Sequence, residues 1–261
     1  MRIEIKDVRK TFTGGRGEEV EALASIDLEV GDREFVSIVG PSGCGKSTLM
    51  EIVGGLTDSS GGEVLIDGEG IRGPHPAVGV IFQQESTFPW RTVVENVEFG
   101  LQMHGVSKSE RRERSRDMVE LVGLKGFEDR YPGQLSGGMR QRVAIARTLV
   151  MNPGVLLMDE PFGALDEQTR LILGDELLRI WSQTQATVLF ITHSIEEATL
   201  LSDRIVVMSA RPGEVRKVVP VDLERPRDSS VVSTPEFGRI TGSVWDVLRE
   251  ESMKALKGLE A

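Results

Sequence analysis

The stretch that most constrains the fold of this chain is a glycine-rich turn between a predicted strand and a predicted helix. The apolar run Phe35–Val39 precedes the turn, and apolar residues at helical spacing follow it between Leu49 and Val53. A Gly-x-x-x-x-Gly-Lys-Ser pattern in this setting predicts a loop whose backbone N–H groups surround phosphate oxygens, at the positive end of the helix dipole. The loop consists of nine residues, Gly40-Pro41-Ser42-Gly43-Cys44-Gly45-Lys46-Ser47-Thr48.

We expect specific roles for two side chains of this loop, and a third has two possible roles. Lys46 is expected to reach the outer phosphates, and the Ser47 hydroxyl to bind Mg²⁺. A tight strand–helix turn that needs glycines only for its backbone does not explain why Lys-Ser follows. Cys44 has two interpretations: a reactive thiolate favoured by the helix N-terminus, or a small buried residue.

Composition limits the class of protein. With 261 residues, the chain is long enough for one large domain or a domain with appendages. Hydrophobic residues make up 39% and charged residues 28%, which is typical of a globular, soluble chain. A net charge of −10 weighs against an extended nucleic-acid surface. The single cysteine excludes an internal disulfide and a Cys-based zinc site, and it fits a reducing compartment.

The chain has no predicted membrane segment. Its first residues lack the apolar core of a signal peptide, and no apolar run approaches the ~20 residues that a membrane span needs. We therefore expect any membrane role to be peripheral.

The N-terminal residues predict a hairpin. Apolar residues alternate from Ile3 and again from Ala22 to Val30, with a glycine-rich turn at residues 14–17 between them. Phe12 precedes the turn. It is either a core aromatic or a platform on which a flat base stacks.

Polar residues follow three of the later predicted strands. Gln83 follows the strand at 78–82, Asp159 and Glu160 follow the strand at 155–158, and His193 follows the strand at 187–191. Ligand-facing groups of an α/β sheet tend to lie at the carboxyl ends of its strands. Asp159 suits a Mg²⁺ site, and Glu160 suits polarising an attacking water. There are two alternatives: Gln83 lies in an ordinary loop at the end of a strand, and His193 has a structural role.

Residues 92–149 are predicted to be helical. The charge-dense part, Lys108–Val122, favours a solvated helix face over a binding patch. Ser136 suits N-capping, and Gly137 and Gly138 expose the first amides of the next helix, which makes this a second candidate anion site. An ordinary helix cap is the alternative.

The C-terminal part contains further elements. A strand is predicted at 204–208, a turn at 211–213, an extended linker at 219–235 and an amphipathic helix at 235–257.

Taken together, these pieces resemble the ATP-binding-cassette (ABC) family over about residues 1–215. Its motifs match in order: the Walker A loop at Gly40–Thr48, the Q-loop at Gln83, the signature motif at Leu135–Arg142, the Walker B strand and glutamate at Val155–Glu160, the D-loop at Ala164–Asp166 and the switch histidine at His193. Phe12 is similar to the family's adenine-stacking aromatic, so the resemblance favours the platform. Residues 88–93, 201–213 and 225–228 resemble the ATPase subunits of nitrate, sulfonate and taurine importers.

The resemblance implies a fold and a domain organisation. The fold class is α/β: a P-loop NTPase core with a mainly parallel sheet, an N-terminal antiparallel β subdomain and a helical subdomain inserted at about 84–150. The ATPase domain is expected to span 1–218, and a C-terminal extension 219–261.

The resemblance also implies a mechanism. ATP and Mg²⁺ are the expected cofactors, and two copies are expected to enclose two ATP molecules head to tail. The implied nucleotide-binding residues are Phe12, Gly40–Thr48, Gln83, Ser136, Gly137, Gly138 and Asp166, with Ser136–Gly138 contributed by the partner copy. The implied catalytic residues are Lys46, Gln83, Glu160 and His193, and the implied Mg²⁺ ligands are Ser47, Gln83 and Asp159.

The resemblance further implies partners and a location. These are polytopic permease subunits, indirectly a solute-binding protein, no nucleic acid, and the cytoplasmic face of the cell membrane. The implied cargo is a small anionic solute such as nitrate, an aliphatic sulfonate or taurine.

Three other classes share some of these motifs. DNA-repair and chromosome-structuring ATPases generally carry a long coiled coil or zinc module between the two site halves, and only about fifty residues intervene here. A P-loop kinase or GTPase would lack the signature motif, and a GTPase would carry an Asn-Lys-x-Asp motif that this chain does not contain. An exporter cassette would carry the same motifs, and only the resemblance of residues 88–93, 201–213 and 225–228 to importer subunits argues against it.

Overall fold

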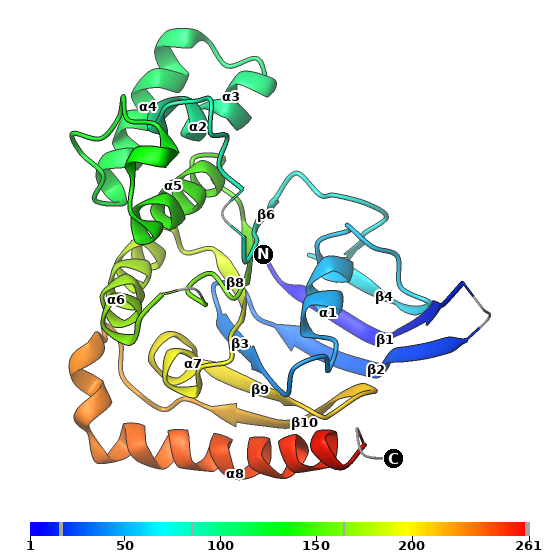
Figure 1. Cartoon of the computed structure of the whole chain (residues 1–261). Helices are drawn as coiled ribbons and strands as arrows, with labels where there is room; N and C mark the ends of the chain where they lie inside the picture. The colour runs from blue at the N-terminus through cyan, green and yellow to red at the C-terminus, as the bar shows by residue number, and fades with distance from the viewer. Residues whose placement is uncertain (16–17, 85, 164, 259–261) are drawn as a thin grey trace.

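The computed structural model describes residues 1–15, 18–84, 86–163 and 165–258 (Figure 1). Residues 16–17 of the predicted turn and Ala164 of the predicted D-loop lie outside these ranges.

The described strands form one sheet, in the order β5-β4-β1-β2-β10-β9-β3-β8-β7-β6. Strands β9, β3, β8, β7 and β6 pair in parallel, and β1, β2, β4 and β5 pair antiparallel. The predicted parallel core and the antiparallel N-terminal part are therefore confirmed. The strands are β1 Ile3–Thr13, β2 Glu19–Val30, β3 Phe35–Val39, β4 Gly61–Ile66, β5 Glu69–Gly70, β6 Val78–Ile81, β7 Val155–Asp159, β8 Thr187–Ile191, β9 Arg204–Met208 and β10 Gly213–Pro220.

Strand β10 was not predicted. It pairs antiparallel with β9 and parallel with β2, so it joins the two parts of the sheet. Only Gly213 and Val219 of this strand are buried, and so few buried positions leave a thin apolar pattern in the sequence. The predicted ATPase domain boundary at residue 218 falls inside β10.

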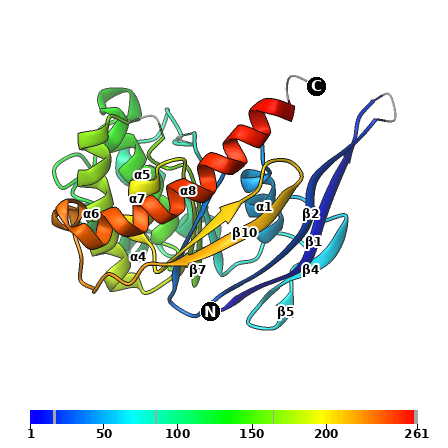
Figure 2. The ribbon, with the colours of Figure 1, turned by 90° about the horizontal axis from the view of Figure 1, so that it is seen from below.

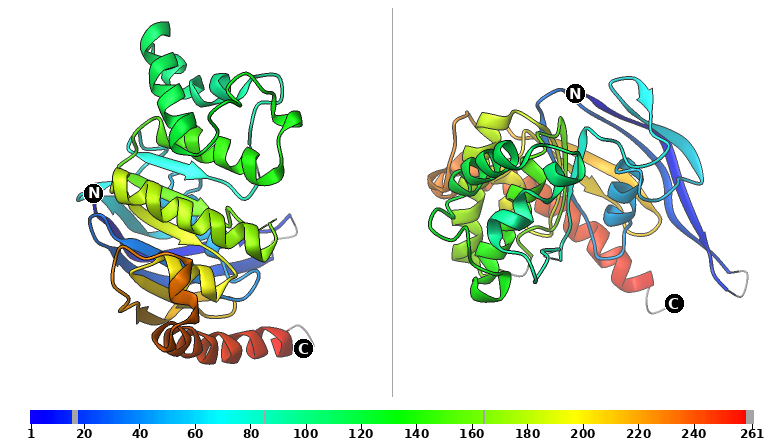
Figure 3. Two further views of the ribbon diagram at one scale, coloured as in Figure 1. Left: turned by 90° about the vertical axis from the view of Figure 1, so that its left-hand side faces the viewer. Right: turned by 90° about the horizontal axis from the view of Figure 1, so that it is seen from above.

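Helices cover both faces of the parallel strands. They are α1 Lys46–Val53, α2 Val93–Val97, α3 Phe99–Met103, α4 Lys108–Leu121, α5 Gly137–Leu149, α6 Glu167–Thr184, α7 Ile195–Leu201 and α8 Pro235–Gly258, with short 3₁₀ turns η1 Pro132–Gln134 and η2 Ser229–Ser233. Helix α1 packs on one face, whereas α5, α6 and α7 pack on the other together with Phe237 of α8. Figure 3 shows α4 and α5 (green) at one end of the molecule and α8 (red) at the opposite end.

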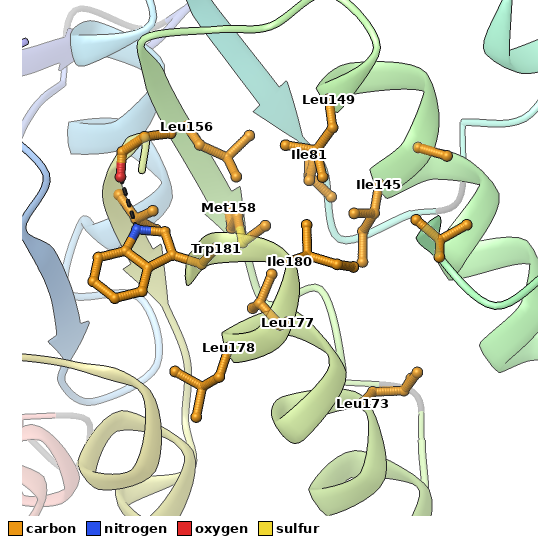
Figure 4. Close-up of a cluster of buried hydrophobic side chains, with 14 of the residues drawn as sticks. Ile81, Ile145, Leu149, Leu156, Met158, Leu173, Leu177, Leu178, Ile180 and Trp181 are labelled. Atoms are coloured by element: carbon orange, nitrogen blue, oxygen red, sulfur yellow. Dashed lines mark hydrogen bonds between the residues drawn. The ribbon is translucent and has the colours of Figure 1, made fainter. Parts of the chain in front are cut away.

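The core follows from side-chain alternation along the strands, since successive residues of a strand point to opposite faces. Leu156 and Met158 of β7 pack with α5 and α6, as Figure 4 shows. Leu157, between them, packs on the other face with Leu49 and Met50 of α1. The first turn of α1 and the loop before it are thereby fixed to the parallel strands.

The helical insertion leaves the sheet after β6 and returns at β7, which is the parallel neighbour of β6. The predicted helical segment begins with two short helices, α2 and α3, interrupted at Glu98. Arg111 and Arg112 of α4 turn inward to the buried Glu98 carboxylate, at 3.7 and 3.5 Å. The predicted solvated face of α4 therefore does not include these two arginines.

The C-terminal segment packs on the core. The predicted helix is confirmed as α8, which contacts α7, β9 and β10 (Figure 2). In the segment predicted as a linker, Arg225 and Arg227 both bind Asp203, at 2.8 and 3.4 Å. Among the described residues, no helix is both long and apolar enough to cross a membrane.

Truncating the buried face of α8 should destabilise the whole domain. Phe237 is 3% exposed and belongs to the core cluster of α5 and α6. We expect Phe237→Ala to lower the free energy of unfolding by about 3–5 kcal/mol, as for other buried aromatics. The matched variant Trp245→Ala, at a residue of α8 that is 54% exposed, should change it little. Denaturant midpoints measure both, and equal midpoints for the two variants would contradict this packing.

Candidate functional site

Several of the predicted site residues lie at the carboxyl edge of the parallel strands. The glycine-rich loop follows β3, Gln83 follows β6, Glu160 follows β7 and His193 follows β8. Gln83 Nε2 donates a hydrogen bond to Glu160 Oε2 at 3.1 Å, and His193 Nε2 lies 2.6 Å from Glu160 Oε1. Two residues far apart in the sequence thus hold the carboxylate of a third.

The loop Gly40–Thr48 has a backbone that requires glycine. Gly43 and Gly45 have φ angles of +75° and +100°, in a region that favours glycine. A Cβ at Gly45 would also lie 2.7 Å from Leu23 Cδ2 and 3.0 Å from the Ala22 carbonyl oxygen. The loop is therefore pressed against β2.

A cavity of about 240 Å³ lies over this loop. Its lining includes Phe12, Glu160, His193 and the loop residues Ser42, Gly43, Gly45, Lys46, Ser47 and Thr48, all of which the sequence predicted. Three further lining residues were not predicted as site residues: Val20, Ala22 and Arg211. The carboxyl end of β9 lies at the same edge, and that position could have indicated Arg211.

Phe12 lies at the far end of β1, opposite Val20 of β2. Its ring is 44% exposed, and Lys10 Nζ lies 4.9 Å from the ring centroid. A ring that is exposed and lines the cavity suits the platform interpretation rather than the core interpretation.

Lys46 is buried beneath the cavity, at 5% exposed. Its Nζ donates to the carbonyl oxygens of Gly40 and Pro41, both at 3.0 Å, and lies 3.9 Å from Cys44 Sγ. The sulfur contact is weak, so a phosphate oxygen would replace it at little cost.

The residues predicted for Mg²⁺ fit a hard divalent cation. Burial raises the pKa of the Asp159 carboxyl, a hydrogen bond with Ser47 opposes the shift, and the charge of Glu160 adds to it. Among the described residues, nothing hydrogen-bonds to the buried Oδ1 of Asp159. An unpartnered buried carboxylate oxygen beside a serine hydroxyl matches the oxygen ligands that Mg²⁺ prefers.

Glu160 is held in a strained backbone conformation. Its φ of +44° is unusual for a residue other than glycine, and its N–H donates to the Ile191 carbonyl of β8 at 2.9 Å. Strain of this kind concentrates at functional sites, where it aims a side chain.

A network behind His193 was not predicted. Thr192 Oγ1 donates to the buried Glu197 carboxylate at 2.5 Å, and Arg170 Nε lies 3.0 Å from the same carboxylate. Burial raises the pKa of Glu197, while the Thr192 hydrogen bond and the Arg170 charge oppose the rise. Arg170 also donates to the Leu165 carbonyl at 3.0 Å. The predicted D-loop is thereby linked to the residue before His193.

Several predicted residues are not among those that line the cavity. Ser136 caps α5 by accepting a hydrogen bond from the Met139 N–H at 3.3 Å, and it begins a separate helix together with Gly137 and Gly138. Asp166 caps α6 by accepting from the Thr169 N–H at 3.0 Å. Gly40, Pro41 and Cys44 are buried within the loop.

The environment of Cys44 favours the buried interpretation. The residue is 1% exposed, and burial raises the pKa of its thiol, although the charge of Lys46 opposes the rise. A buried neutral thiol is a poor nucleophile.

A phosphate loop that shares a cavity with a carboxylate and a histidine, with a glutamine bonded to that carboxylate, defines a P-loop nucleotide hydrolase. A family model described as ABC transporter matches residues 23–163. The chain is 49% identical to an uncharacterized ABC transporter ATP-binding protein of Methanocaldococcus jannaschii, over 98% of this chain and 95% of that one. This chain belongs to the ABC transporter family, as an ATP-binding subunit with ATPase activity.

Two other relatives carry the names of importers. Identity is 43% to the nitrate import ATP-binding protein of Synechocystis, over 95% of this chain and 96% of that one. Identity is 47% to the aliphatic sulfonates import ATP-binding protein of Bacillus thuringiensis, over 88% of this chain and 90% of that one. A dimeric ATP-binding cassette solved with ADP and phosphate has a TM-score of 0.74 and 35% identity, over 85% of this chain and all of that one.

Cys44 should resist labelling in the folded protein. Because the thiol is buried and its pKa is raised, we expect maleimide to react many times more slowly than in the denatured chain, at a rate that follows local opening. Labelling that is quenched at successive times and followed by mass spectrometry measures the rate. Labelling of the native protein as fast as a free thiol would support the reactive interpretation instead.

Proposed function

We propose that this chain is the ATP-hydrolysing subunit of an ABC importer for a small anion such as nitrate, an aliphatic sulfonate or taurine. The observation that carries the proposal is the Glu160 carboxylate, held by Gln83 and His193 beside the glycine-rich loop. The nitrate and sulfonate names of the relatives support the cargo class.

In this proposal the loop binds the phosphates of ATP. The N–H groups of residues 43–48 and the start of α1 face the negative oxygens, and Lys46 adds a positive charge. Phe12 stacks on the adenine at the other end of the cavity.

Ser47, Gln83 and Asp159 would hold Mg²⁺. When bound, the ion neutralises charge that develops on the phosphate oxygens. Gln83 would thereby connect the ion to Glu160, to which its amide already donates.

Glu160 would act as the general base. It orients a water for in-line attack on the γ-phosphorus and accepts a proton from it, while the bond to the ADP oxygen breaks. The hydrogen bond from Gln83 and the contact with His193 fix the direction of the carboxylate. His193 is then in place to contact the γ-phosphate.

The site would be completed by a second copy of the chain. Ser136, Gly137 and Gly138 form the N-terminus of α5, where the first N–H groups have no partner within the helix, but they do not line the cavity of their own chain. A head-to-tail dimer would bring this helix end to the γ-phosphate of the partner, and Asp166 would lie at the same interface. The related cassette solved with ADP and phosphate is a dimer.

The proposal includes partners and a location. Two permease subunits in the membrane would bind the helical insertion, a solute-binding protein would deliver the anion, and nucleic acid would have no role. The chain would then lie peripherally on the cytoplasmic face of the membrane.

Removing the proposed base should separate binding from turnover. We expect Glu160→Gln to keep ATP binding, to lower the hydrolysis rate by at least ~10²-fold because no group accepts the proton, and to accumulate as an ATP-bound dimer. Phosphate release and light scattering measure these effects. Glu196→Gln, at an exposed glutamate outside the cavity, is the matched control. Near-normal phosphate release by Glu160→Gln would refute this role.

A deletion strain tests the cargo class. We expect loss of growth on one anionic nitrogen or sulfur source, with loss of uptake of the labelled compound, and rescue by the wild-type chain but not by Glu160→Gln. A purified complex should contain a polytopic membrane protein. Unchanged uptake of every anion tested would contradict the cargo, and export of a compound by the purified complex would contradict the direction.

A further inference from the structure

The turn between β9 and β10 places a positively charged side chain at the cavity over the glycine-rich loop. Arg211 of this turn lines the cavity, together with Lys46 on the glycine-rich loop. Among the described lining residues, Arg211 and Lys46 are the two that are arginine or lysine, and they belong to different elements.

Arg211 contacts the glycine-rich loop directly. Its Nε donates a hydrogen bond to the Gly43 carbonyl at 3.3 Å, and its side chain is otherwise exposed. The start of β10 also approaches the loop closely, since a Cβ at Gly213 would lie 2.2 Å from the Cys44 carbonyl oxygen. The turn and the loop therefore form one wall of the cavity.

The turn is a defined structure with internal hydrogen bonds. Ser209 Oγ donates to the Pro212 carbonyl at 2.9 Å and accepts from the Glu214 N–H at 2.8 Å. Any displacement of its backbone would therefore move Arg211 as well.

The C-terminal helix holds this turn from the opposite side. Glu251 of α8 is 3% exposed, and its Oε2 accepts a hydrogen bond from the Ala210 N–H at 3.1 Å. Lys254 and Arg216 lie 2.5 and 3.2 Å from its Oε1. Burial alone would raise the pKa of Glu251, but the hydrogen bonds from Lys254 and Ala210 and the charges of Lys254 and Arg216 outweigh it, so the pKa is lowered.

We propose that Arg211 is a further ATP-binding residue, which contacts the polyphosphate, and that Glu251 of α8 is the positioning residue that holds it there. A guanidinium has five N–H donors in a planar fork, and the Gly43 carbonyl engages one of them. The remaining donors suit phosphate oxygens, to which arginine binds in a bidentate manner. The inference rests on the proposed ATP site.

Nucleotide titrations test Arg211. We expect Arg211→Ala to weaken the binding of a non-hydrolysable ATP analogue with Mg²⁺ by about tenfold, as for the loss of a charge-assisted hydrogen bond. Arg211→Lys should recover part of the loss, because it keeps the charge but not the fork. Lys217→Ala, at an exposed lysine of β10, is the matched control and should bind normally.

A double-mutant cycle tests Glu251. We expect Glu251→Gln to weaken analogue binding and to raise KM more than it lowers kcat, and to add nothing in the Arg211→Ala background. Arg216→Gln, which removes one of the carboxylate's partners, should have a smaller effect of the same kind. Glu250→Gln, at the exposed neighbouring position, should have none. Additive losses from Glu251 and Arg211 would show that α8 does not act through Arg211.

Lys46→Ala separates this inference from the proposed site. If Lys46→Ala abolishes analogue binding but Arg211→Ala leaves it unchanged, the site stands and the inference is wrong. If Lys46→Ala also binds normally, the nucleotide does not use this cavity and both are wrong.

Discussion

The close approach of the Gly40–Thr48 backbone to its neighbours is the constraint on which the rest of the site depends. Gly45 allows contact with β2, Gly40 allows contact with Met208 of β9, and Gly213 allows the start of β10 to reach the Cys44 carbonyl. Because three strands converge on one loop, the segments next to them bring side chains to the same cavity. The hairpin of β1 and β2 delivers Phe12, and the turn after β9 delivers Arg211.

The other side of the cavity depends on the parallel pairing of β6, β7 and β8. In-register parallel strands end together, so Gln83, Glu160 and His193 meet without any local sequence relation among them. Glu160 accepts contacts from both neighbours. The buried Glu197, which binds both Thr192 and Arg170, extends this arrangement to the start of α6, where Asp166 lies. A movement of α6 would therefore displace the residues next to His193.

The sequence predicts those parts of the structure that local patterns encode. The buried strands are short, mostly apolar runs, and the loop is a fixed spacing of glycines, so both were predicted correctly. Strand β10 has few buried residues, and the partnership of Glu98 with Arg111 and Arg112 joins different helices, so neither has a local signal. The same holds for Glu251, which meets the turn through the packing of α8, whereas the position of Arg211 after the carboxyl end of β9 could have indicated it. Contacts between distant residues depend on the complete fold, and a single sequence does not display them.

Half of the proposed site comes from the N-terminus of α5 in another copy, and mixing two inactive variants tests that claim most directly. Lys46→Ala disables the loop, and Ser136→Arg blocks the helix end. A mixed head-to-tail dimer contains one site with both halves intact, so an equimolar mixture should recover about a quarter of the wild-type ATPase rate, given random pairing and two-fold symmetry. No recovery, with mixed dimers demonstrated by mass spectrometry, would contradict a site shared between two copies.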